Sequence, residues 1–219
     1  MTDDLWIGQP LWMYGLTAVV IVVILILLIR GLKRRSARIR REQLDPKRIT
    51  IQDIDQMEGA EFERYLYRLF SELGYEDTYK TKDSSDFGAD LVFTDRLGVR
   101  NVLQAKRYQE SSAISLDAVQ EVYGSMRYYQ AKRSIVLTSA ARFTAACETL
   151  AGVNGVKLLN REDLIELIED FKSGHYEDAM DRIEAEAYTE LSPWAEYMDQ
   201  HLHSPGRDRK AEKWLRNRS

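Results

Sequence analysis

The sequence predicts an α/β fold, in the form of an α/β sandwich around a mixed central sheet. Helical and strand-like patterns alternate through the middle of the chain in the order α-β-β-β-α-β-α-β-α. The central strand-like runs are apolar on both faces, as expected of strands that helices cover on both sides. A glycine-containing turn at residues 94–98 joins two of the runs into a hairpin. Together these observations favour a sheet with antiparallel and parallel parts.

The individual elements follow from local patterns. Apolar residues recur at three- and four-residue spacing from Phe62 to Leu73, and Gly74 supplies a stop, which predicts the first helix. Thr144 and Asn160 can each accept a hydrogen bond from the free amides at the start of a following helix. The predicted strands cover residues 76–80, 89–93, 100–106, 134–138 and 156–159, and the later helices cover residues 116–129, 144–152 and 161–171.

A charge-free stretch between Asp4 and Arg30 precedes this domain. As a helix, residues 11–29 would be about 28 Å long, close to the hydrocarbon thickness of a bilayer. Basic residues follow directly, and such residues stay on the cytoplasmic side of a membrane helix. We therefore expect a single-pass transmembrane helix in the cell (inner) membrane, with the N-terminus outside and the rest of the chain in the cytoplasm. The alternative for this stretch is a buried core helix.

Five segments result from this division of the chain. They are an extracytoplasmic N-terminus (1–10), a transmembrane helix (11–29), a basic juxtamembrane segment and linker (30–54), the α/β domain (55–172), and an acidic helical segment with a basic tail (173–219). The basic run can contact lipid headgroups or a nucleic acid. Residues 161–203 hold 13 acidic and 3 basic side chains, which favours a protein partner or a lid for this part of the chain.

Composition excludes several kinds of site. The chain has one cysteine, Cys147, so it has no disulfide framework and no cysteine metal cluster. Its three histidines, His175, His201 and His203, lie far in sequence from the polar residues of the predicted strands, which argues against a histidine zinc site. The net charge of −4 means that any contact with DNA must come from a local basic patch.

Polar residues inside otherwise apolar strands indicate the chemistry. Asp90 begins one predicted strand of the hairpin, and Gln104 and Lys106 lie two residues apart on the next, so both point to the same face. A carboxylate with further oxygens suits Mg²⁺, and a neighbouring lysine can orient a water or stabilise charge at a phosphodiester. Glu63, on the preceding helix, could complete the metal site. Taken singly, Asp90 could instead cap a turn, Lys106 could reach solvent, and Glu63 could be a solvated helix residue.

In their order these residues resemble the Mrr-type catalytic domain of restriction endonucleases, within the PD-(D/E)XK nuclease superfamily. The resemblance rests on Gly59-Ala-Glu-Phe-Glu63 with Leu73-Gly74-Tyr75, on Asp86-Phe-Gly-Ala-Asp90, on Gln104-Ala-Lys-Arg-Tyr108, and on Thr138, Phe143-Thr144-Ala-Ala146 and Val156-Lys-Leu-Leu159. It implies a restriction-endonuclease-like fold, with Asp90 as the metal-binding aspartate, Gln104 as the second motif position and metal ligand, Lys106 as the catalytic lysine and Glu63 as the acidic partner. Asp86 could bind a second metal or cap the turn.

The resemblance implies a Mg²⁺-dependent DNA endonuclease, with Mn²⁺ as a substitute cation, of the type IV (Mrr-like) class that restricts foreign or modified DNA. The apolar stretch adds the expectation that this endonuclease is membrane-tethered. The alternative is a catalytically silent membrane-anchored adaptor that binds DNA or a protein. We expect DNA and the bilayer as partners, and a homodimer is also compatible with the sequence. A phosphate-contacting patch could come from Lys80, Lys82, Arg100, Arg107, Lys132, Arg133 and Arg142, of which Lys82, Arg107 and Arg142 are the selected candidates.

Overall fold

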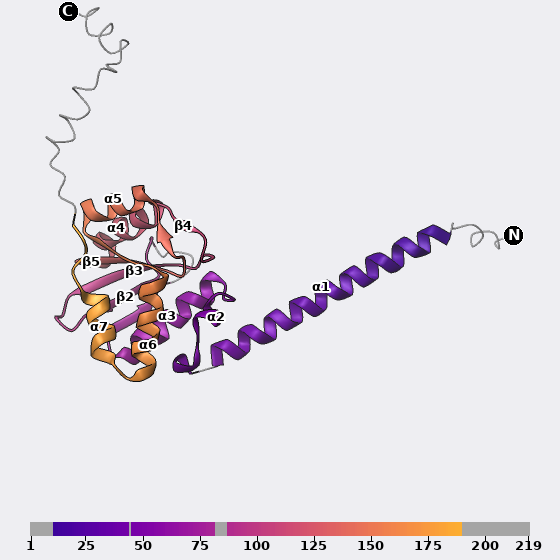
Figure 1. Cartoon of the computed structure of the whole chain (residues 1–219), viewed down its shortest axis with the longest axis horizontal. Coiled ribbons are helices and arrows are strands. Elements are labelled where there is room, and N and C mark those ends of the chain that lie inside the picture. The colour runs from indigo at the N-terminus through magenta and orange to yellow at the C-terminus, as the bar shows by residue number, and fades with distance from the viewer. Residues whose placement is uncertain (1–10, 44, 82–86, 190–219) are drawn as a thin grey trace, which may run out of the picture.

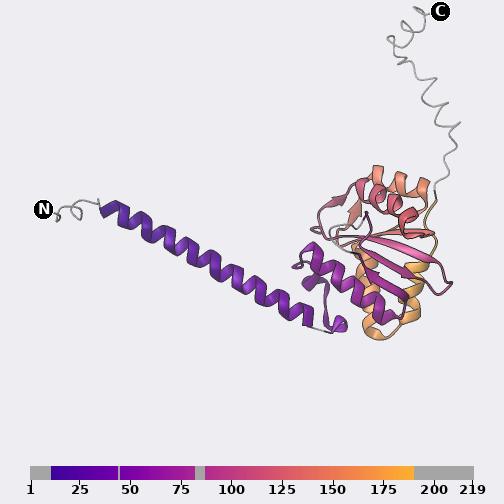
Figure 2. The same cartoon turned by 180° about the vertical axis from the view of Figure 1, so that it is seen from behind.

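The computed structural model describes residues 11–43, 45–81 and 87–189, and it has a mixed sheet between two layers of helices (Figure 1). A long helix, α1 (Leu11–Gln43), extends away from this domain, as both views show (Figure 2). The α/β fold with a mixed sheet is therefore confirmed.

The main sheet has five strands in the order β1-β2-β3-β5-β7. Strand β2 pairs antiparallel with both β1 and β3, whereas β5 pairs parallel with both β3 and β7. Strand β3 therefore joins the antiparallel part of the sheet to the parallel part. A two-stranded parallel sheet, β4 with β6, lies apart from it. The strands are β1 (Glu76–Lys80), β2 (Leu91–Thr94), β3 (Arg100–Lys106), β4 (Ala113–Ile114), β5 (Arg133–Thr138), β6 (Arg142–Phe143) and β7 (Val156–Leu159).

Successive residues of the strands pack alternately into two hydrophobic clusters, one on each face of the sheet. Leu103 packs with helices α3 (Gly59–Leu73) and α6 (Arg161–Ser173), while its neighbour Val102 packs with α4 (Asp117–Tyr129) and α5 (Ala145–Asn154). Gln104 and Lys106 share the parity of Val102, so they project toward the α4 side.

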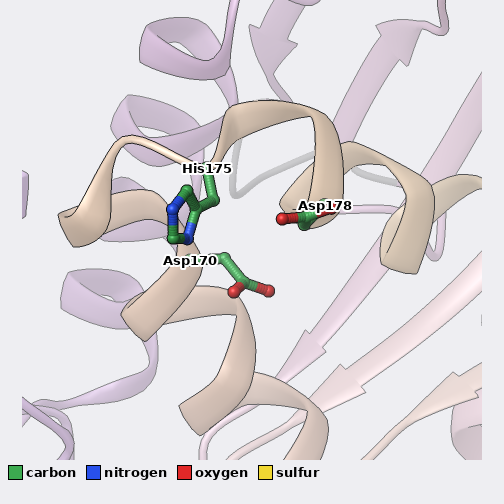
Figure 3. Close-up of side chains that lie close together, drawn as sticks. All are labelled: Asp170, His175 and Asp178. Carbon is green, nitrogen blue, oxygen red and sulfur yellow. The ribbon is translucent and has the colours of Figure 1, made fainter.

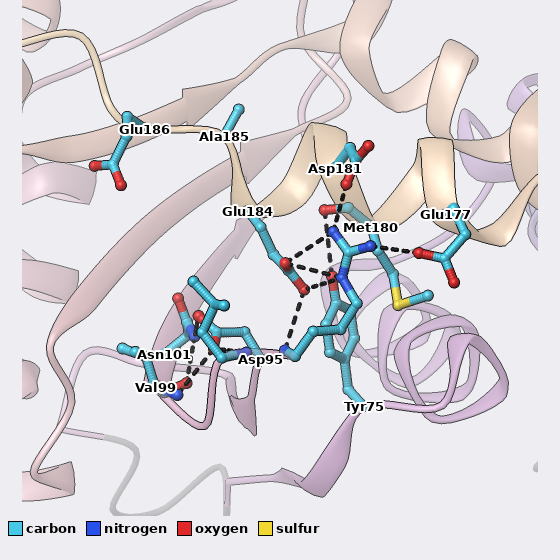
Figure 4. Close-up of polar contacts among 12 residues, drawn as sticks. Tyr75, Asp95, Val99, Asn101, Glu177, Met180, Asp181, Glu184, Ala185 and Glu186 are labelled. Carbon is cyan, nitrogen blue, oxygen red and sulfur yellow. Dashed lines mark hydrogen bonds and ion pairs between the residues drawn. The ribbon is translucent and has the colours of Figure 1, made fainter.

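Polar contacts fasten the C-terminal helix α7 (Tyr176–Glu184) to the β2–β3 turn (Figure 4). Arg96 of the turn pairs with Glu177 and Asp181 at 2.5 Å and with Glu184 at 2.9 Å. Arg133 pairs with Glu186 at 2.9 Å. Acidic side chains of this segment therefore bind arginines of the same chain. Helix α7 ends at Glu184, so residues 185–189 of the predicted acidic helical segment (173–219) are not helical.

The part before the domain differs from the expected linker. Helix α1 continues without interruption through the basic run to Gln43, and a 3₁₀ turn (Pro46–Arg48) and the short helix α2 (Ile51–Ile54) follow. Thr50 and Asp53 start α2 by bonding to each other's backbone amides.

The apolar half of α1 is exposed in the single chain, with large side chains from Leu16 to Leu32 roughly half accessible wherever they are described. In the part of the chain that the structure describes, no helix combines the length and the apolar character that crossing a membrane requires. The transmembrane helix predicted over residues 11–29 is therefore not supported. The apolar run and the basic run are two parts of one helix.

Candidate active site

Asp90 lies immediately before β2, where the hairpin register places it opposite Gln104. Its backbone amide donates to the carbonyl of Leu103 at 2.9 Å. Its Oδ2 accepts two hydrogen bonds of 2.7 Å, from the backbone amide of Ala105 and from Nε2 of Gln104. The carboxyl group is buried, and the donors fix its orientation, since hydrogen bonds to a carboxylate are stronger than those between neutral groups.

In the contacts described for this position, the side-chain amide of Gln104 donates a hydrogen bond but accepts none. Its amide nitrogen is committed to Asp90, whereas its Oε1 is buried and has no hydrogen-bond partner among the described residues. A buried acceptor without a partner is costly, and this one is distinguished from the other such atoms of the described residues by its place beside the Asp90 carboxylate. A carboxylate beside an amide oxygen is a donor set that suits a hard divalent cation such as Mg²⁺.

Lys106 ends β3 on the same face and reaches helix α4. Its Nζ donates to Oε2 of Glu121 at 2.5 Å, and its carbonyl accepts from Oγ1 of Thr138 on β5 at 2.7 Å. The lysine side chain is about one-fifth exposed, so its ammonium lies at the border of the site and solvent. Its charge is also among the causes that hold the pKa of Asp117 below its usual value, after the hydrogen bond that Asp117 accepts from Ser115.

Glu63 comes from α3, which covers the other face of the sheet. Its carboxylate pairs with Lys80 at 2.9 Å, and Lys80 also donates to the carbonyl of Thr81 at 3.4 Å. Thr81 in turn donates from its amide to the carbonyl of Asp90 at 3.0 Å and from Oγ1 to that of Ala89 at 2.7 Å. The structure thus links Glu63 to the Asp90 turn through Lys80 and Thr81.

Comparison with known protein families places the chain in one of them. A family model described as a restriction endonuclease, the Mrr catalytic domain, matches residues 54–168, just over half of the chain. The chain belongs to this restriction endonuclease family. The matched region contains Glu63, Asp90, Gln104 and Lys106.

Individual relatives of this restriction endonuclease domain are distant. The type IV methyl-directed restriction enzyme EcoKMrr of Escherichia coli (strain K12) is 27% identical over 130 residues, which cover 57% of this chain and 42% of the relative. The chain therefore spans less than half of that relative's length. Among solved structures, the MspJI restriction endonuclease in complex with a 27-mer oligonucleotide is 19% identical with a TM-score of 0.39, covering 57% of this chain and 32% of that one. The DNA modification-dependent restriction endonuclease AspBHI is 17% identical with a TM-score of 0.40, covering 68% and 42%.

The basic residues predicted to contact DNA occupy different surroundings in the endonuclease domain. Lys82 lies outside the described residues, as does Asp86. Arg107 donates from Nε to the carbonyl of Met57 at 2.8 Å and from a terminal nitrogen to the carbonyl of Asp55, so it ties β3 to the segment before α3. Arg142 is exposed at the start of β6. Of the three, only Arg142 is described as a solvent-facing basic side chain.

Sequence patterns alone did not single out Glu121 or Thr81, although both contact the site. An exposed glutamate on a helix has no distinguishing pattern, and its relation to Lys106 depends on the packing of α4 against β3. A second group of acidic residues with a histidine lies elsewhere, at the α6–α7 turn (Figure 3). Ligand atoms of Asp170, His175 and Asp178 lie within 4.8 Å of one another. Asp170 also accepts from Arg182 at 3.4 Å, and we assign this group no function.

Proposed function

We propose that this protein is a Mg²⁺-dependent DNA endonuclease that hydrolyses phosphodiester bonds. One observation carries the proposal: the buried Asp90 carboxylate, the unpartnered Oε1 of Gln104 and the ammonium of Lys106 come from two adjacent strands within one small region. The position of this acceptor beside a buried carboxylate is what suits a divalent cation. Membership of the restriction endonuclease family supports the same chemistry.

Each of these residues has a separate role in the proposed hydrolysis. Asp90 and Oε1 of Gln104 would hold the cation, for which Mn²⁺ could substitute, and Glu63 is the further acidic group that the sequence suggests. A bound divalent cation polarises a phosphate oxygen and lowers the pKa of water. Lys106 orients the attacking water and stabilises negative charge on the phosphate oxygens. The water oxygen bonds to phosphorus while the bond from phosphorus to the leaving sugar oxygen breaks, and the leaving oxygen takes up a proton.

Cleavage of plasmid DNA tests this proposal. The full chain is incubated with supercoiled plasmid in Mg²⁺ or in EDTA, beside Asp90→Ala and Lys106→Ala variants whose folding is checked by circular dichroism. Asp178→Ala, in the exposed group at the α6–α7 turn, serves as a matched control for loss of a carboxylate. We expect nicking or linearisation by the wild type and the control in Mg²⁺ only. Equal cleavage by the wild type and both site variants would refute the assignment.

We further propose modified DNA as the substrate, within the type IV (Mrr-like) class. The support is the name of the distant relative, a methyl-directed enzyme, of which this chain covers less than half. Plasmids prepared with and without methylation, otherwise identical, separate the possibilities. Preferential cutting of the methylated plasmid supports this specificity, whereas equal cutting of both assigns a general endonuclease.

Attachment to a membrane remains a proposal for localisation. Its support is the exposed apolar surface of α1 from Leu16 to Ile29, followed directly by the basic residues of the sequence, since exposed apolar surface of this extent requires a covering phase. Fractionation of cells that express the full chain, with and without residues 1–43, tests it. Recovery of both forms in the soluble fraction would remove the proposal.

A silent adaptor is the second candidate function, and the ion pair between Lys106 and Glu121 is the observation in its favour. A lysine neutralised by a neighbouring carboxylate contributes less charge at a phosphate. Metal binding distinguishes the two functions. An endonuclease binds Mg²⁺ in a titration that Asp90→Asn abolishes, whereas an adaptor shows no such dependence on Asp90.

A further inference from the structure

An open groove of about 480 Å³ lies at the antiparallel edge of the sheet. Three tyrosines and three polar residues form most of its lining: Tyr79, Tyr128, Tyr129, Lys80, Thr81 and Arg100. Two of the tyrosines are well exposed, Tyr79 at 44% and Tyr128 at 62%. Two large aromatic rings are therefore accessible beside cationic side chains, and such rings combine a wide apolar face with a polar hydroxyl.

An aromatic stack extends this surface toward the catalytic turn. The ring of Tyr128 lies 4.2 Å from that of Phe87, at an interplanar angle of 32°, and Tyr129 meets Tyr128 edge-on at 4.9 Å. Phe87 is itself 54% exposed and has a left-handed backbone with φ of 47°. A bulky residue rarely adopts that conformation, so the contact with Tyr128 holds an otherwise unfavourable turn in place.

Contacts of its lining residues link the groove to the candidate active site. Thr81, in its wall, is hydrogen-bonded to the Asp90 backbone, and Lys80 pairs with Glu63. Tyr128 lies seven residues after Glu121, the partner of Lys106, so one face of α4 borders both the catalytic lysine and the groove. A DNA strand bound at the candidate active site would therefore lie close to the groove.

The charges of the groove suit a polyanion. Arg100 has no carboxylate partner among the described residues, so its guanidinium remains available for a phosphate. Lys80 also contributes to the lining, but its ammonium pairs with Glu63 of α3 on the other face of the sheet, so Arg100 is the cation that we assign to the groove. Cations that follow a backbone and aromatic rings that accept bases are the two parts of a typical binding surface for single strands.

We propose that this groove binds unpaired nucleotides of the DNA strand next to the cleaved phosphate. Bases stack on Tyr128 and Tyr79, while Arg100 contacts a flanking phosphate. Only an unpaired or unstacked base exposes a ring face for such contact, so the ligand is a single-stranded, frayed or extrahelical stretch. The inference rests on the proposed function and adds to it the form of DNA that the site accepts.

Binding in EDTA tests the groove separately from cleavage. The full chain is titrated into a fluorescein-labelled single-stranded oligothymidine and into a duplex of the same length, and anisotropy gives the dissociation constants. The variants are Tyr128→Leu and Tyr79→Leu, with Tyr128→Phe to retain the ring. Tyr123→Leu is the matched control, because Tyr123 is an exposed tyrosine of the same helix that does not line the groove.

We expect the leucine variants to bind the single strand roughly 5-fold to 100-fold more weakly, as loss of a stacked base predicts. Tyr128→Phe and Tyr123→Leu should bind like the wild type, and duplex binding should change little. Wild-type affinity in both groove variants, or an equal loss in Tyr123→Leu, overturns the inference. Ring-dependent binding without any cleavage in Mg²⁺ leaves the groove intact and rejects the nuclease. Cleavage with no ring-dependent binding rejects the groove alone.

Discussion

A β-carbon placed on Gly88 would lie 2.4 Å from the carbonyl oxygen of Glu121. The turn that leads into Asp90 therefore rests directly on the backbone of α4. Glu121 also binds the ammonium of Lys106 through its side chain. One residue of the helix thus contacts the chain on both sides of the site, and it fixes the spacing between the aspartate turn and the lysine.

This packing predicts a large effect of Gly88→Ala. The backbone at Gly88 has φ of +90°, which disfavours alanine, and the added carbon meets backbone that cannot rotate away. We expect the free energy of unfolding to fall by about 2 kcal/mol or more, and cleavage to fall with it, since the Asp90 turn must shift. Chemical denaturation measures the first and plasmid cleavage the second.

Gly98→Ala is the matched control for this experiment. Gly98 also has a left-handed backbone, with φ of +74°, but a β-carbon there meets nothing within 4 Å. It should lose only the conformational term, about 1 kcal/mol, and retain activity. Equal losses in the two variants would show that backbone conformation alone, and not the contact with α4, matters at Gly88.

Glu121→Gln should leave stability nearly unchanged but alter binding. The ion pair with Lys106 is partly exposed, so its removal should change the free energy of unfolding by less than about 1 kcal/mol. Removing a negative charge beside the site should tighten DNA binding a few-fold at low salt and less at high salt. Anisotropy titrations in EDTA at two salt concentrations measure this. Weaker binding by the variant would instead mean that Glu121 positions Lys106 for its contact with DNA.

The pair between Asp55 and Arg161 predicts a dependence of stability on low pH. The hydrogen bond from Arg161, whose two nitrogens each lie 2.7 Å from the carboxylate, lowers the pKa of Asp55 below its ordinary value of 3.8. A carboxyl group whose pKa is lowered in the folded state stabilises the folded state at pH values above the ordinary pKa. This contribution is lost as the pH falls through the pKa of the folded state.

Thermal unfolding of the wild type and Asp55→Asn, measured between pH 7 and pH 3, checks this dependence. The wild type should be the more stable protein near neutral pH, and the difference should shrink below about pH 4. Because the Asp55 side chain is 37% exposed, the difference should be modest. A difference that stays constant over this range would assign the effect to packing and not to charge.

Cys147 should be unreactive in the folded protein. Cys147 lies on the buried face of α5, in the hydrophobic cluster beneath the helix, and burial raises the pKa of its thiol to about 11. Little thiolate is then present at pH 8, and thiolate is the reactive form. Reaction with Ellman's reagent should be slow in buffer and rapid in denaturing urea. Fast reaction without denaturant would indicate that α5 opens readily.

Much of the fold was predictable because its strands carry clear patterns. The structure has strands at residues 76–80, 100–106 and 156–159, as predicted, and Thr144 and Asn160 cap their helices. The short pair of β4 and β6 was not predicted, because a two-residue strand has no periodicity to detect. The strand expected from residue 89 begins at Leu91, because Asp90 turns its carboxylate back onto β3.

The candidate site was predictable to the extent that it lies on strands. The hairpin and the two-residue spacing bring Asp90 and Gln104 together, as expected. The contacts of Glu63 and Glu121 could not be foreseen, because they depend on how α3 and α4 sit on opposite faces of the sheet. The sequence likewise shows an acidic C-terminal segment, but only the fold reveals that Arg96 and Arg133 bind it.

Strand β3 carries Gln104 and Lys106 and is hydrogen-bonded along both edges, antiparallel to β2 and parallel to β5. Its amides should therefore exchange with solvent deuterium only when the whole domain opens, unlike those of edge strand β1. Gln104 and Lys106 thus lie on the strand that we expect to open least often. A change in the spacing between Asp90 and Lys106 should consequently arise in the turn before Asp90 or in α4, which contact each other through Gly88 and Glu121, and not in the strand itself.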